Sequence, residues 1–334
     1  MRKRWLTAAV LSVCTPLTLA QAPGTQPGAT TGACDRSCLE GLLNGYLQSM
    51  LSHTPATAPV APSVRFKENN KAYALGQTAT WKSVTGLTDY RIYVSDPAAG
   101  QAEFVGILQF GPQHSFFSLR IQVKDQRIVA ADTIVPGAGL SASDLSDSAL
   151  GMFAGGAALG GHARPGFAQE LPPDQHPTRA ELAASARSYY EAINTGRPDV
   201  ATFAPDCHRI ENGVPTVNDP KGQFPVFSKD GRTLPNFFAM GCREQMNTGV
   251  WNTELVDHIE VPVIDAARGV AVATGLFHHQ GKSRCANTRG YGVVCQKNPV
   301  PMTILLTELF KVRAGQIGEI ESVWFILPHK GKAQ

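Results

Sequence analysis

Three ionisable side chains, Arg209, His279 and Glu308, form the candidate chemical set of this sequence. A histidine titrates near neutral pH and can take or give a proton during a reaction. A carboxylate can orient or polarise that histidine, and an arginine can bind a carboxylate, an enolate or another oxyanion. The combination predicts proton abstraction beside a carbonyl group, in a lyase, dehydratase or isomerase that needs no cofactor.

An internal repeat singles out these three residues. The pair Glu68-Asn69 recurs as Glu211-Asn212, 143 residues later. The same spacing carries Pro55 onto Pro198 and Tyr46 onto Tyr189. The chain is therefore predicted to contain one structural unit made twice, so that each unit serves as a control for the other.

Matched strands of the two units predict which side chains point inward, because strand residues alternate between two faces. The turns at 96–100 and 265–269 align the strands that follow them. The inward set Ala102, Phe104, Gly106, Leu108 and Phe110 then corresponds to Ala271, Ala273, Gly275, Phe277 and His279. In other strands Phe66 becomes Arg209 and Leu119 becomes Glu308. We expect a first unit filled by Phe66, Phe104, Leu108, Phe110 and Leu119, and a second unit with an emptier, more polar interior.

Two interpretations of the polar interior stay open. Buried charges without partners are costly, so the three groups need one another, water or a ligand. One interpretation is a structural Arg209–Glu308 ion pair beside a hydrogen-bonded histidine, and the other is a catalytic or binding site. The further candidates for substrate contacts are Glu211, Asn212, Tyr190 and Trp324. The recurrence of the Glu-Asn pair also fits a role in the fold, and the two aromatic residues also fit the core.

The order of predicted elements is the same in both units. Helices are predicted at 38–52 and 179–194 from their apolar spacing. Strands are predicted at 64–69, 90–94, 101–110, 114–124 and 127–135 in the first unit, and at 207–212, 256–264, 270–280, 303–313 and 316–327 in the second. The segments 213–250 and 281–301 are predicted to be irregular. A helix followed by an antiparallel meander indicates an α+β fold in which a curved sheet wraps a helix to make a cone.

The predicted domain plan has six parts. They are a signal peptide at 1–20, a disordered lead-in at 21–33, a first cone at 34–135, a linker rich in Gly, Ala and Pro at 136–178, a second cone at 179–328 and a tail at 329–334. The signal peptide is indicated by Arg2-Lys3-Arg4 followed by a short apolar run, too short to span a membrane. We therefore expect export to the periplasm or the extracellular space.

Charge and motifs narrow the possible partners. The chain has 30 basic and 27 acidic residues, and the signal peptide carries three of the basic ones, which leaves 27 of each. No basic tract is interleaved with aromatic residues, so neither nucleic acid nor, after signal removal, a membrane is expected as a partner. The sequence also lacks a Gly-x-Ser-x-Gly elbow, a phosphate loop and a dinucleotide fingerprint, which disfavours serine-hydrolase, kinase and Rossmann chemistry.

Six cysteines remain after signal removal, and an even number in an exported chain predicts disulfides. Their spacing predicts sequential pairs Cys34–Cys38, Cys207–Cys242 and Cys285–Cys295, although other pairings are possible. No metal site is expected, because the sequence has neither Cys-x2-Cys nor a histidine pair at ligand spacing on a helix.

Several short segments resemble the nuclear-transport-factor-2-like (SnoaL-like, cystatin-like) superfamily, in an exported subfamily with two tandem cones. They are 34–39, the strand with Glu68-Asn69, 207–213, Gly241-Cys242 with Glu244-Gln245, and 262–265. The resemblance covers 34–135 and 178–328 and implies a helix packed into a strongly curved antiparallel sheet in each unit. The superfamily includes isomerases, dehydratases, cyclases, lyases and hydrolases, and also binding domains without chemistry. The alternative to an enzyme is therefore a non-catalytic protein that binds a small molecule.

The outward strand faces predict how the two cones assemble. Val105 and Ile107 in the first unit and Val272 and Leu276 in the second form apolar outward sets. Single cones of the superfamily often pair through their sheets, and the predicted linker is long enough to let two cones of one chain do so. We expect a monomer with a fixed pseudo-dimer of cones.

Overall fold

The computed structural model describes residues 34–136, 162–221, 226–228, 237–249, 251, 254–279, 285–288, 292–296 and 301–327. The predicted signal peptide and lead-in, the predicted tail and most of the predicted linker lie outside these residues. All described residues belong to one compact unit, Gly32–Gln334. Among the described helices, none has the length and hydropathy of a membrane span.

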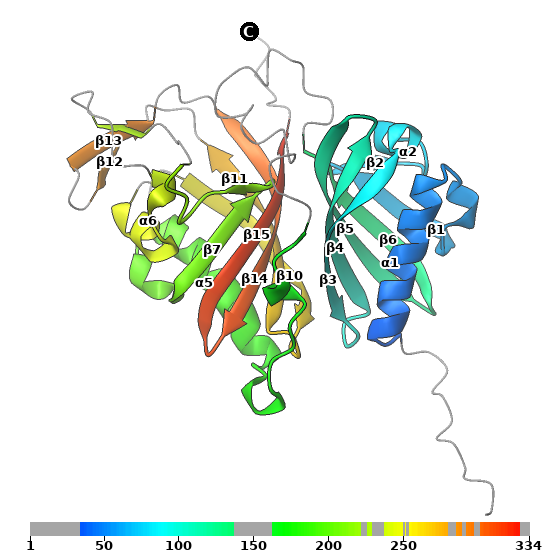
Figure 1. Cartoon of the computed structure of the whole chain (residues 1–334), viewed down its shortest axis with the longest axis horizontal. Coiled ribbons are helices and arrows are strands. Elements are labelled where there is room, and N and C mark those ends of the chain that lie inside the picture. Colours follow the sequence, from blue (N-terminus) through cyan, green and yellow to red (C-terminus); the bar gives the residue numbers. More distant parts are fainter. Residues whose placement is uncertain are drawn as a thin grey trace, which may run out of the picture. The chain divides into compact units, whose positions relative to one another are not determined.

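The first cone is a helix packed against a six-stranded sheet (Figure 1). Its elements are α1 (Arg36–Leu51), β1 (Val60–Glu68), β2 (Lys71–Tyr73), α2 (Ala79–Ser83), β3 (Gly86–Asp96), β4 (Gln101–Phe110), β5 (Gln113–Lys124) and β6 (Arg127–Ile134). The strand order is β2-β1-β6-β5-β4-β3. The helix α1 begins after Asp35, whose side chain accepts a hydrogen bond from the Cys38 backbone N–H and so caps the helix.

The second cone repeats this arrangement. Its elements are α5 (Arg179–Thr195), β7 (Phe203–Glu211), β8 (Val214–Pro215), β10 (Glu254–Asp265), β11 (Val270–His279), β14 (Met302–Arg313) and β15 (Gln316–Leu327). Its strand order, β10-β11-β14-β15-β7-β8, matches that of the first cone when it is read from β8 to β10. A capping box formed by Thr178 and Glu181 starts α5, and Gly196 ends it in the left-handed conformation with φ of 66°. The α+β fold with two cones is confirmed.

Two details of the sequence prediction are wrong. Neither sheet is wholly antiparallel, because β1 pairs with β6 and β7 with β15 in parallel. After β2 the chain crosses to β3, at the opposite edge of the sheet. The hairpins β3–β4, β4–β5 and β5–β6 then bring β6 beside β1, and the two strands run in the same direction. The segments expected to be irregular also contain regular elements, namely α6 (Cys242–Thr248), β9 (Val226–Ser228), β12 (Cys285–Thr288) and β13 (Gly292–Gln296), the last three forming a small sheet.

The predicted correspondence of inward positions is confirmed by strand register. Phe104 lies opposite Leu119 in the first cone, and Ala273 lies opposite Glu308 at the matching place in the second. The first core buries Phe66, Phe104, Leu108 and Leu119, with Phe110 packed against it. The first cone is thus filled by the apolar side chains that the sequence indicated.

The recurring asparagine has a structural role in both cones. Asn69 and Asn212 have positive φ angles of 50° and 44°, in the left-handed region that asparagine tolerates better than most residues. The Asn69 carboxamide accepts from the Val135 N–H and donates to the Val135 carbonyl. Asn212 makes the same two bonds with Trp324. The repeated asparagine therefore bonds to the backbone at or just after the last strand, in chain order, of each six-stranded sheet.

The outward faces of the two sheets share a third apolar core. It contains Val105 and Ile107 from β4 and Val272 from β11, as predicted, together with Phe167, whereas the predicted Leu276 is not part of it. Phe167 belongs to a short 3-10 helix, Pro165–Phe167, in the described end of the predicted linker. This end also contacts the second cone, since the Lys311 ammonium donates to the Gln169 carbonyl at 2.7 Å.

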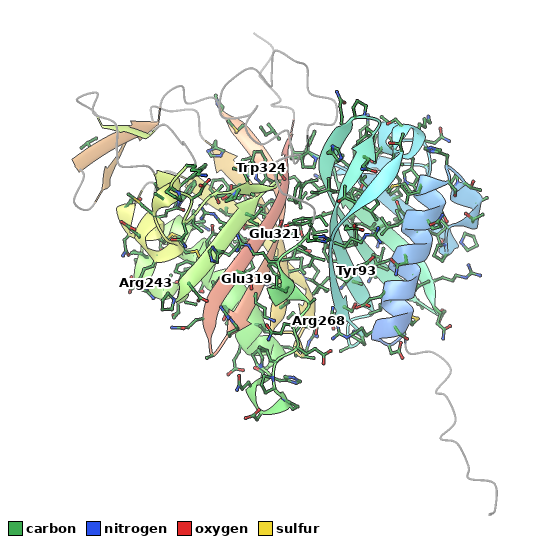
Figure 2. The ribbon with its side chains drawn as sticks, in the orientation of Figure 1. Tyr93, Arg243, Arg268, Glu319, Glu321 and Trp324 are labelled. Atoms are coloured by element: carbon green, nitrogen blue, oxygen red, sulfur yellow. A yellow bond between two sulfur atoms is a disulfide. The ribbon has the colours of Figure 1, made fainter. Side chains whose placement is uncertain are left out.

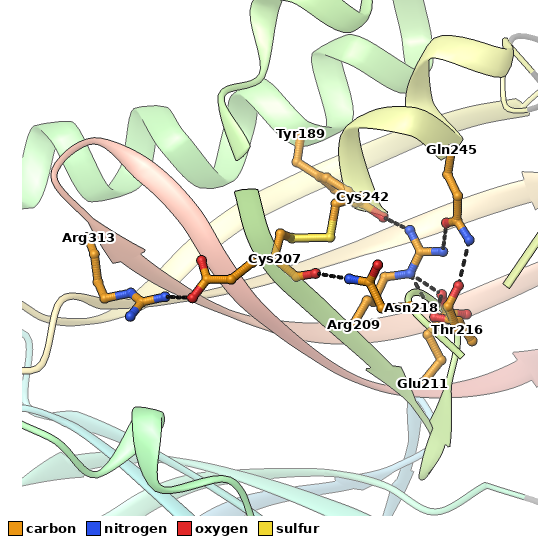
Figure 3. Close-up of a disulfide and its surroundings, with 10 residues drawn as sticks. Tyr189, Cys207, Arg209, Glu211, Thr216, Asn218, Cys242, Gln245 and Arg313 are labelled. Atoms are coloured by element: carbon orange, nitrogen blue, oxygen red, sulfur yellow. Dashed lines mark hydrogen bonds and ion pairs between the residues drawn. A yellow bond between two sulfur atoms is a disulfide. The ribbon is translucent and has the colours of Figure 1, made fainter. Parts of the chain in front are cut away.

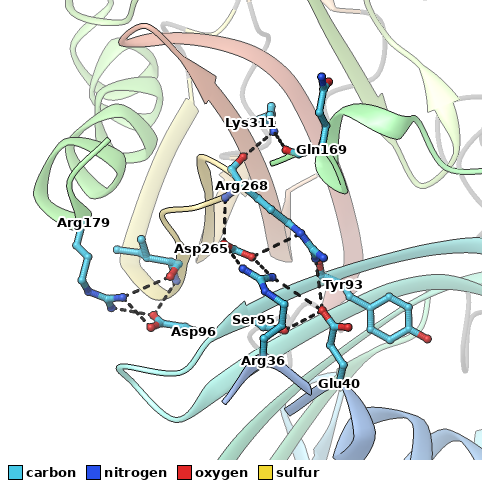
Figure 4. Close-up of polar contacts among 11 residues, drawn as sticks. Arg36, Glu40, Tyr93, Ser95, Asp96, Gln169, Arg179, Asp265, Arg268 and Lys311 are labelled. Carbon is cyan, nitrogen blue, oxygen red and sulfur yellow. Dashed lines mark hydrogen bonds and ion pairs between the residues drawn. The ribbon is translucent and has the colours of Figure 1, made fainter. Parts of the chain in front are cut away.

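Two reciprocal ion pairs join the cones side by side, with Asp96 accepting a hydrogen bond from the backbone N–H of Ile264, the neighbour of Asp265 (Figure 4). Arg36, the first residue of α1, donates to both carboxylate oxygens of Asp265, at 2.5 and 2.8 Å. Arg179, the first residue of α5, donates to both oxygens of Asp96, at 2.7 and 2.8 Å. Each arginine starts the helix of one cone and each aspartate ends a strand of the other, as in an isologous dimer interface.

Breaking one reciprocal pair should destabilise the whole compact unit. Asp96 is buried, so Arg179→Met leaves its charge with only the backbone N–H groups of Ile264 and Ala99. We expect Arg179→Met to lower the free energy of unfolding by about 2 to 3 kcal/mol. Arg179→Met combined with Asp96→Asn should recover part of this loss. Urea unfolding followed by circular dichroism measures both.

The matched control is Arg313→Met, which removes the exposed pair between Arg313 and Asp206 at 3.1 Å. Exposed pairs contribute less than about 1 kcal/mol, so this variant should resemble the wild type. If Arg179→Met costs no more than Arg313→Met, the reciprocal pairs do not hold the cones together.

Two buried carboxyl groups lie at the interface between the cones. Glu103 on β4 and Glu321 on β15 are each 1% exposed. Glu321 projects from β15 toward the first cone, where it accepts a hydrogen bond from the Tyr90 hydroxyl at 2.7 Å (Figure 2). Burial raises the pKa of Glu103 to about 8 and that of Glu321 to about 8, although Arg120 and Tyr90 respectively oppose the shift. Both groups are therefore predominantly protonated in the folded protein at neutral pH.

The stability of the protein should consequently fall as the pH rises. A carboxyl whose folded pKa exceeds its unfolded pKa stabilises the fold below the unfolded value and loses this contribution as the pH passes the folded value. For both glutamates, this contribution is therefore lost between the ordinary pKa of 4.5 and the folded pKa of about 8. Each group can contribute a slope of up to about 1.4 kcal/mol per pH unit.

Glu103→Gln and Glu321→Gln test this expectation. Each variant should unfold at higher denaturant concentration than the wild type at about pH 8, and the difference should vanish near about pH 5. A wild-type stability that is constant over this range, or that rises, contradicts the assignment.

Candidate functional site

Two consecutive tyrosines of α5 bring polar groups into the interior of the second cone. The rings of Tyr189 and Tyr190 meet edge to face with their centroids 5.5 Å apart. Both also pack against Phe310 of β14, at 5.4 and 5.9 Å. This packing fixes the two hydroxyl groups, which serve different partners.

The Tyr190 hydroxyl donates to Glu308 Oε2 at 2.6 Å. Glu308 is 5% exposed and lies opposite Ser322 of β15. Burial and the charge of Glu211 raise the pKa of Glu308 to about 7, against the lowering effect of hydrogen bonds from Tyr190 and Ser322 and of the Arg209 charge. A carboxyl with a pKa near neutrality can both take and give a proton at physiological pH.

Arg209 is held by four neighbouring side chains (Figure 3). Its Nε donates to Thr216 Oγ1 at 2.9 Å and lies 2.7 Å from Glu211 Oε1. Its Nη1 donates to the Tyr189 hydroxyl at 3.2 Å, and its Nη2 to Gln245 Oε1 at 2.6 Å. The guanidinium is 2% exposed, so these bonds fix a permanent positive charge inside the cone.

The helix α6 supplies Gln245 to this network. The disulfide Cys207–Cys242 ties the first residue of α6 to β7. The Gln245 amide Nε2 donates to the carbonyls of Thr216 and Phe237, at 2.6 and 2.7 Å, which leaves its oxygen for Arg209. The sequence prediction missed Thr216, Tyr189 and Gln245 as partners of Arg209. The available signal was the predicted disulfide Cys207–Cys242, which places Gln245 near the strand of Arg209, but the segment 213–250 was expected to be irregular and the helix α6 was missed.

His279 points inward as predicted, but Glu308 does not orient it. Along β11, His279 lies opposite Met302, whereas Glu308 lies opposite Ala273. His279 lies six residues beyond Ala273 along the strand, which corresponds to about 20 Å. The His279 ring instead packs near Phe277, with centroids 5.1 Å apart. The predicted pairing of His279 with Glu308 is therefore wrong. The alternation of side chains shows which face of the sheet a residue is on, but not how far along the strand it lies.

The remaining predicted residues divide between network and framework. Glu211 pairs with Arg209, so the ion pair of the structural interpretation, Arg209–Glu308, is replaced by Arg209–Glu211. Asn212 uses its carboxamide on the backbone of Trp324, and the buried Trp324 belongs to the cone core. His278 faces outward as expected, with its Nε2 2.9 Å from Asp257 Oδ1 and its Nδ1 3.1 Å from Thr303 Oγ1.

The first cone shows how specific this polar set is to the second. At the spacings of the repeat, Leu47, Leu119 and Phe66 correspond to Tyr190, Glu308 and Arg209. All three first-cone residues are buried in the apolar core. The fold therefore does not require polar groups at these positions, and the second cone carries them in addition to the framework.

Two of the three predicted disulfides are formed, Cys34–Cys38 and Cys207–Cys242. Cys285 and Cys295 lie directly opposite each other on β12 and β13, but their side chains are outside the described residues. Within the described part of the chain, no group of three or more His, Cys, Asp or Glu side chains is arranged to hold a metal ion.

One family model matches the chain, at residues 175–324, and it is described as a domain of unknown function (DUF8021). The matched segment spans the helix and most strands of the second cone. No curated protein matches the sequence.

Solved structures similar to this chain match it over less than half its length. A putative ketosteroid isomerase from Kribbella flavida is 13% identical, with 31% of this chain and 82% of that chain covered and a TM-score of 0.25. A putative polyketide cyclase from Xanthomonas campestris pv. campestris is 17% identical, with coverages of 43% and 90% and a TM-score of 0.26. A designed protein with the nuclear-transport-factor-2 fold is 12% identical, with coverages of 31% and 88% and a TM-score of 0.25. From its helix and the order of its six strands, each half of the chain has the nuclear-transport-factor-2-like cone fold.

Proposed function

We propose that the second cone binds a small organic molecule and catalyses a cofactor-independent proton transfer on it, with Glu308 as the acid–base group. The observation that supports this proposal best is the Glu308 carboxyl itself. Burial raises its pKa to about 7, and the Tyr190 hydroxyl holds it at 2.6 Å. The same position is Leu119 in the first cone, so the cost of burying this carboxyl is not imposed by the fold.

The chemistry follows from the charges in the interior. Ionised Glu308 takes a proton from a carbon beside a carbonyl group, and the electron pair of that C–H bond moves onto the carbonyl oxygen as an enolate. Arg209 supplies a fixed positive charge in the same interior, and a guanidinium has five N–H groups, more than the three that donate to Thr216, Tyr189 and Gln245. Return of the proton to another carbon gives an isomerase, and loss of a leaving group from the neighbouring carbon gives a lyase or dehydratase.

His279 has no role in the reaction under this proposal. It lies six residues along β11 from the position opposite Glu308, about 20 Å away, which is too far to contact a small molecule held at Glu308. We assign Trp324, two residues along β15 from the strand partner of Glu308, to contacts with the rest of the substrate. Remote contacts of this kind hold the reacting carbon at the base.

A non-catalytic binding protein is the second candidate. The observation that favours it is the engagement of Arg209, since each of its three guanidinium nitrogens already donates to a protein side chain. In that case the network shapes the interior and Glu308 hydrogen-bonds a ligand without transferring a proton.

The setting of this activity is proposed to be outside the cytoplasm, in a monomer. The disulfides Cys34–Cys38 and Cys207–Cys242 favour an oxidising compartment. The outward sheet faces already pack against each other within one chain, which leaves those faces unavailable for a second copy.

Glu308→Gln and Tyr190→Phe separate the two candidates. Small organic acids, lactones and phenolics are screened by thermal shift, and the ligands found are tested for turnover. For an enzyme, Glu308→Gln should retain binding but lower kcat by about 10²- to 10⁴-fold. The rate should rise with pH through the pKa of Glu308, about 7. Tyr190→Phe removes a hydrogen bond that lowers this pKa, so the midpoint of the pH–rate profile should move to higher pH.

His278→Gln serves as the control, because His278 faces outward on the strand that carries His279. It should leave both the rate and its midpoint unchanged. Loss of affinity in Glu308→Gln, with no turnover of any ligand by the wild type, would establish the binding protein instead. A midpoint that does not move in Tyr190→Phe would remove Glu308 as the titrating group.

A further inference from the structure

A second candidate site lies outside the two cone interiors. A cavity of about 570 Å³, partly open to solvent, lies between the outward faces of the sheets. Its lining includes Glu103, Ser118 and Asp132 from the first cone and Glu260, Leu276 and Thr307 from the second. Its volume lies in the range of small-molecule sites. Nothing in the proposed function of the second cone uses this cavity.

Three polar atoms on the wall of this cavity are buried without hydrogen-bond partners among the described residues. They are both carboxyl oxygens of Glu103 and the hydroxyl oxygen of Thr307. The Ser118 and Thr307 hydroxyls make only weak hydrogen-bonding contacts with the Glu103 carboxyl, which lower its pKa without fully satisfying its oxygens. Buried polar groups in proteins are nearly always satisfied, so a carboxyl and a hydroxyl left together at a cavity indicate a group that binds there.

Glu103 also lacks a counter-ion of its own. Its cross-strand neighbour is Arg120, but that guanidinium donates to Asp132 at 2.9 Å. The other charged lining residues are Lys67 and Glu260, and His258 completes the titratable set. The carboxylates of Asp132 and Glu260 balance the charges of Lys67 and Arg120, so ionisation of Glu103 adds a negative charge that has no counter-ion in the lining. The cavity therefore favours a positively charged ligand when Glu103 is ionised.

We propose that this cavity binds a small organic cation, namely a primary ammonium group attached to a compact apolar body. An ammonium group has three N–H donors, which match the two oxygens of Glu103 and the oxygen of Thr307. Ile134, Leu276 and Leu305 line the cavity and provide apolar contacts for the body of the ligand. A bound cation would compensate the charge of a carboxylate that the fold alone buries at a cost.

Other ligand charges fit the lining less well. An anion would meet the carboxylates of Glu103, Asp132 and Glu260. A neutral alcohol can satisfy protonated Glu103, but it gains nothing when Glu103 ionises. The pH dependence of binding distinguishes these cases, because a cation that binds ionised Glu103 displaces one proton. Its affinity should rise about tenfold per pH unit below the pKa of that group.

The test uses benzylammonium as the cation and benzyl alcohol as the neutral probe of similar shape. Binding to the full exported chain is measured by calorimetry from about pH 6 to about pH 8, where the amine remains protonated. Benzylammonium should bind and tighten with pH, and benzyl alcohol should not tighten. Glu103→Gln should weaken benzylammonium binding at least about tenfold at the upper pH. The same variant should be more stable than the wild type there, so lost binding is separable from lost folding.

Glu321→Gln is the matched control. Glu321 is as buried as Glu103 and also faces the other cone, but it bonds to Tyr90 and does not line the cavity. This variant should bind benzylammonium like the wild type, and so should Glu308→Gln, which alters only the second-cone interior. Unchanged affinity in Glu103→Gln, affinity that does not rise with pH, tighter binding of the alcohol than of the amine, or no binding of either probe would each overturn the proposal.

Discussion

The exchange of arginines between the cones fixes the geometry on which the rest of the structure depends. Arg36 and Arg179 are each the first residue of a helix, and each donates to an aspartate of the other cone, Asp265 and Asp96 respectively. Each aspartate also accepts a backbone N–H from its own turn, at Arg268 or Ala99. A single carboxylate therefore sets the turn, holds the partner helix and aligns the two sheets. Because the aspartates are buried, removal of either arginine affects local and global order together.

This interface explains why only one cone needs to carry chemistry. In a pair of identical cones, every substitution appears twice and must be tolerated in both interiors. In a single chain the two copies change independently, so the first can keep Phe104 opposite Leu119 while the second places Ala273 opposite Glu308. The filled first cone provides rigidity through the shared outward core, and the second can accept buried polar groups that reduce its own stability.

The sequence predicted the fold and the faces well, because both follow from local periodicity and from the repeat. Alternation placed Arg209, His279 and Glu308 on inward faces, and the register confirmed the matched positions. It could not predict that His279 and Glu308 are far apart along the sheet, since alternation carries no information about distance along a strand. It also missed the contact of Gln245 with Arg209: the disulfide that ties α6 to β7 was predicted, but the helix itself was not, because the segment 213–250 was expected to be irregular. Arg36 and Arg179 differ by the repeat spacing of 143, a signal present in the sequence whose meaning needed the interface.

The buried carboxyls Glu103, Glu308 and Glu321 link stability to the candidate sites. Burial raises the pKa of each above its ordinary range, so each prefers its neutral form in the folded protein. Glu321 meets this cost with a hydrogen bond from Tyr90, and Glu308 with one from Tyr190. Glu103 has only weak contacts of this kind, with Ser118 and Thr307, and lies at a cavity. A carboxyl that a hydrogen bond satisfies can remain for structural reasons alone, whereas an unsatisfied one lowers stability in every molecule without a ligand. That asymmetry is the physical reason to look for a ligand at Glu103 rather than at Glu321.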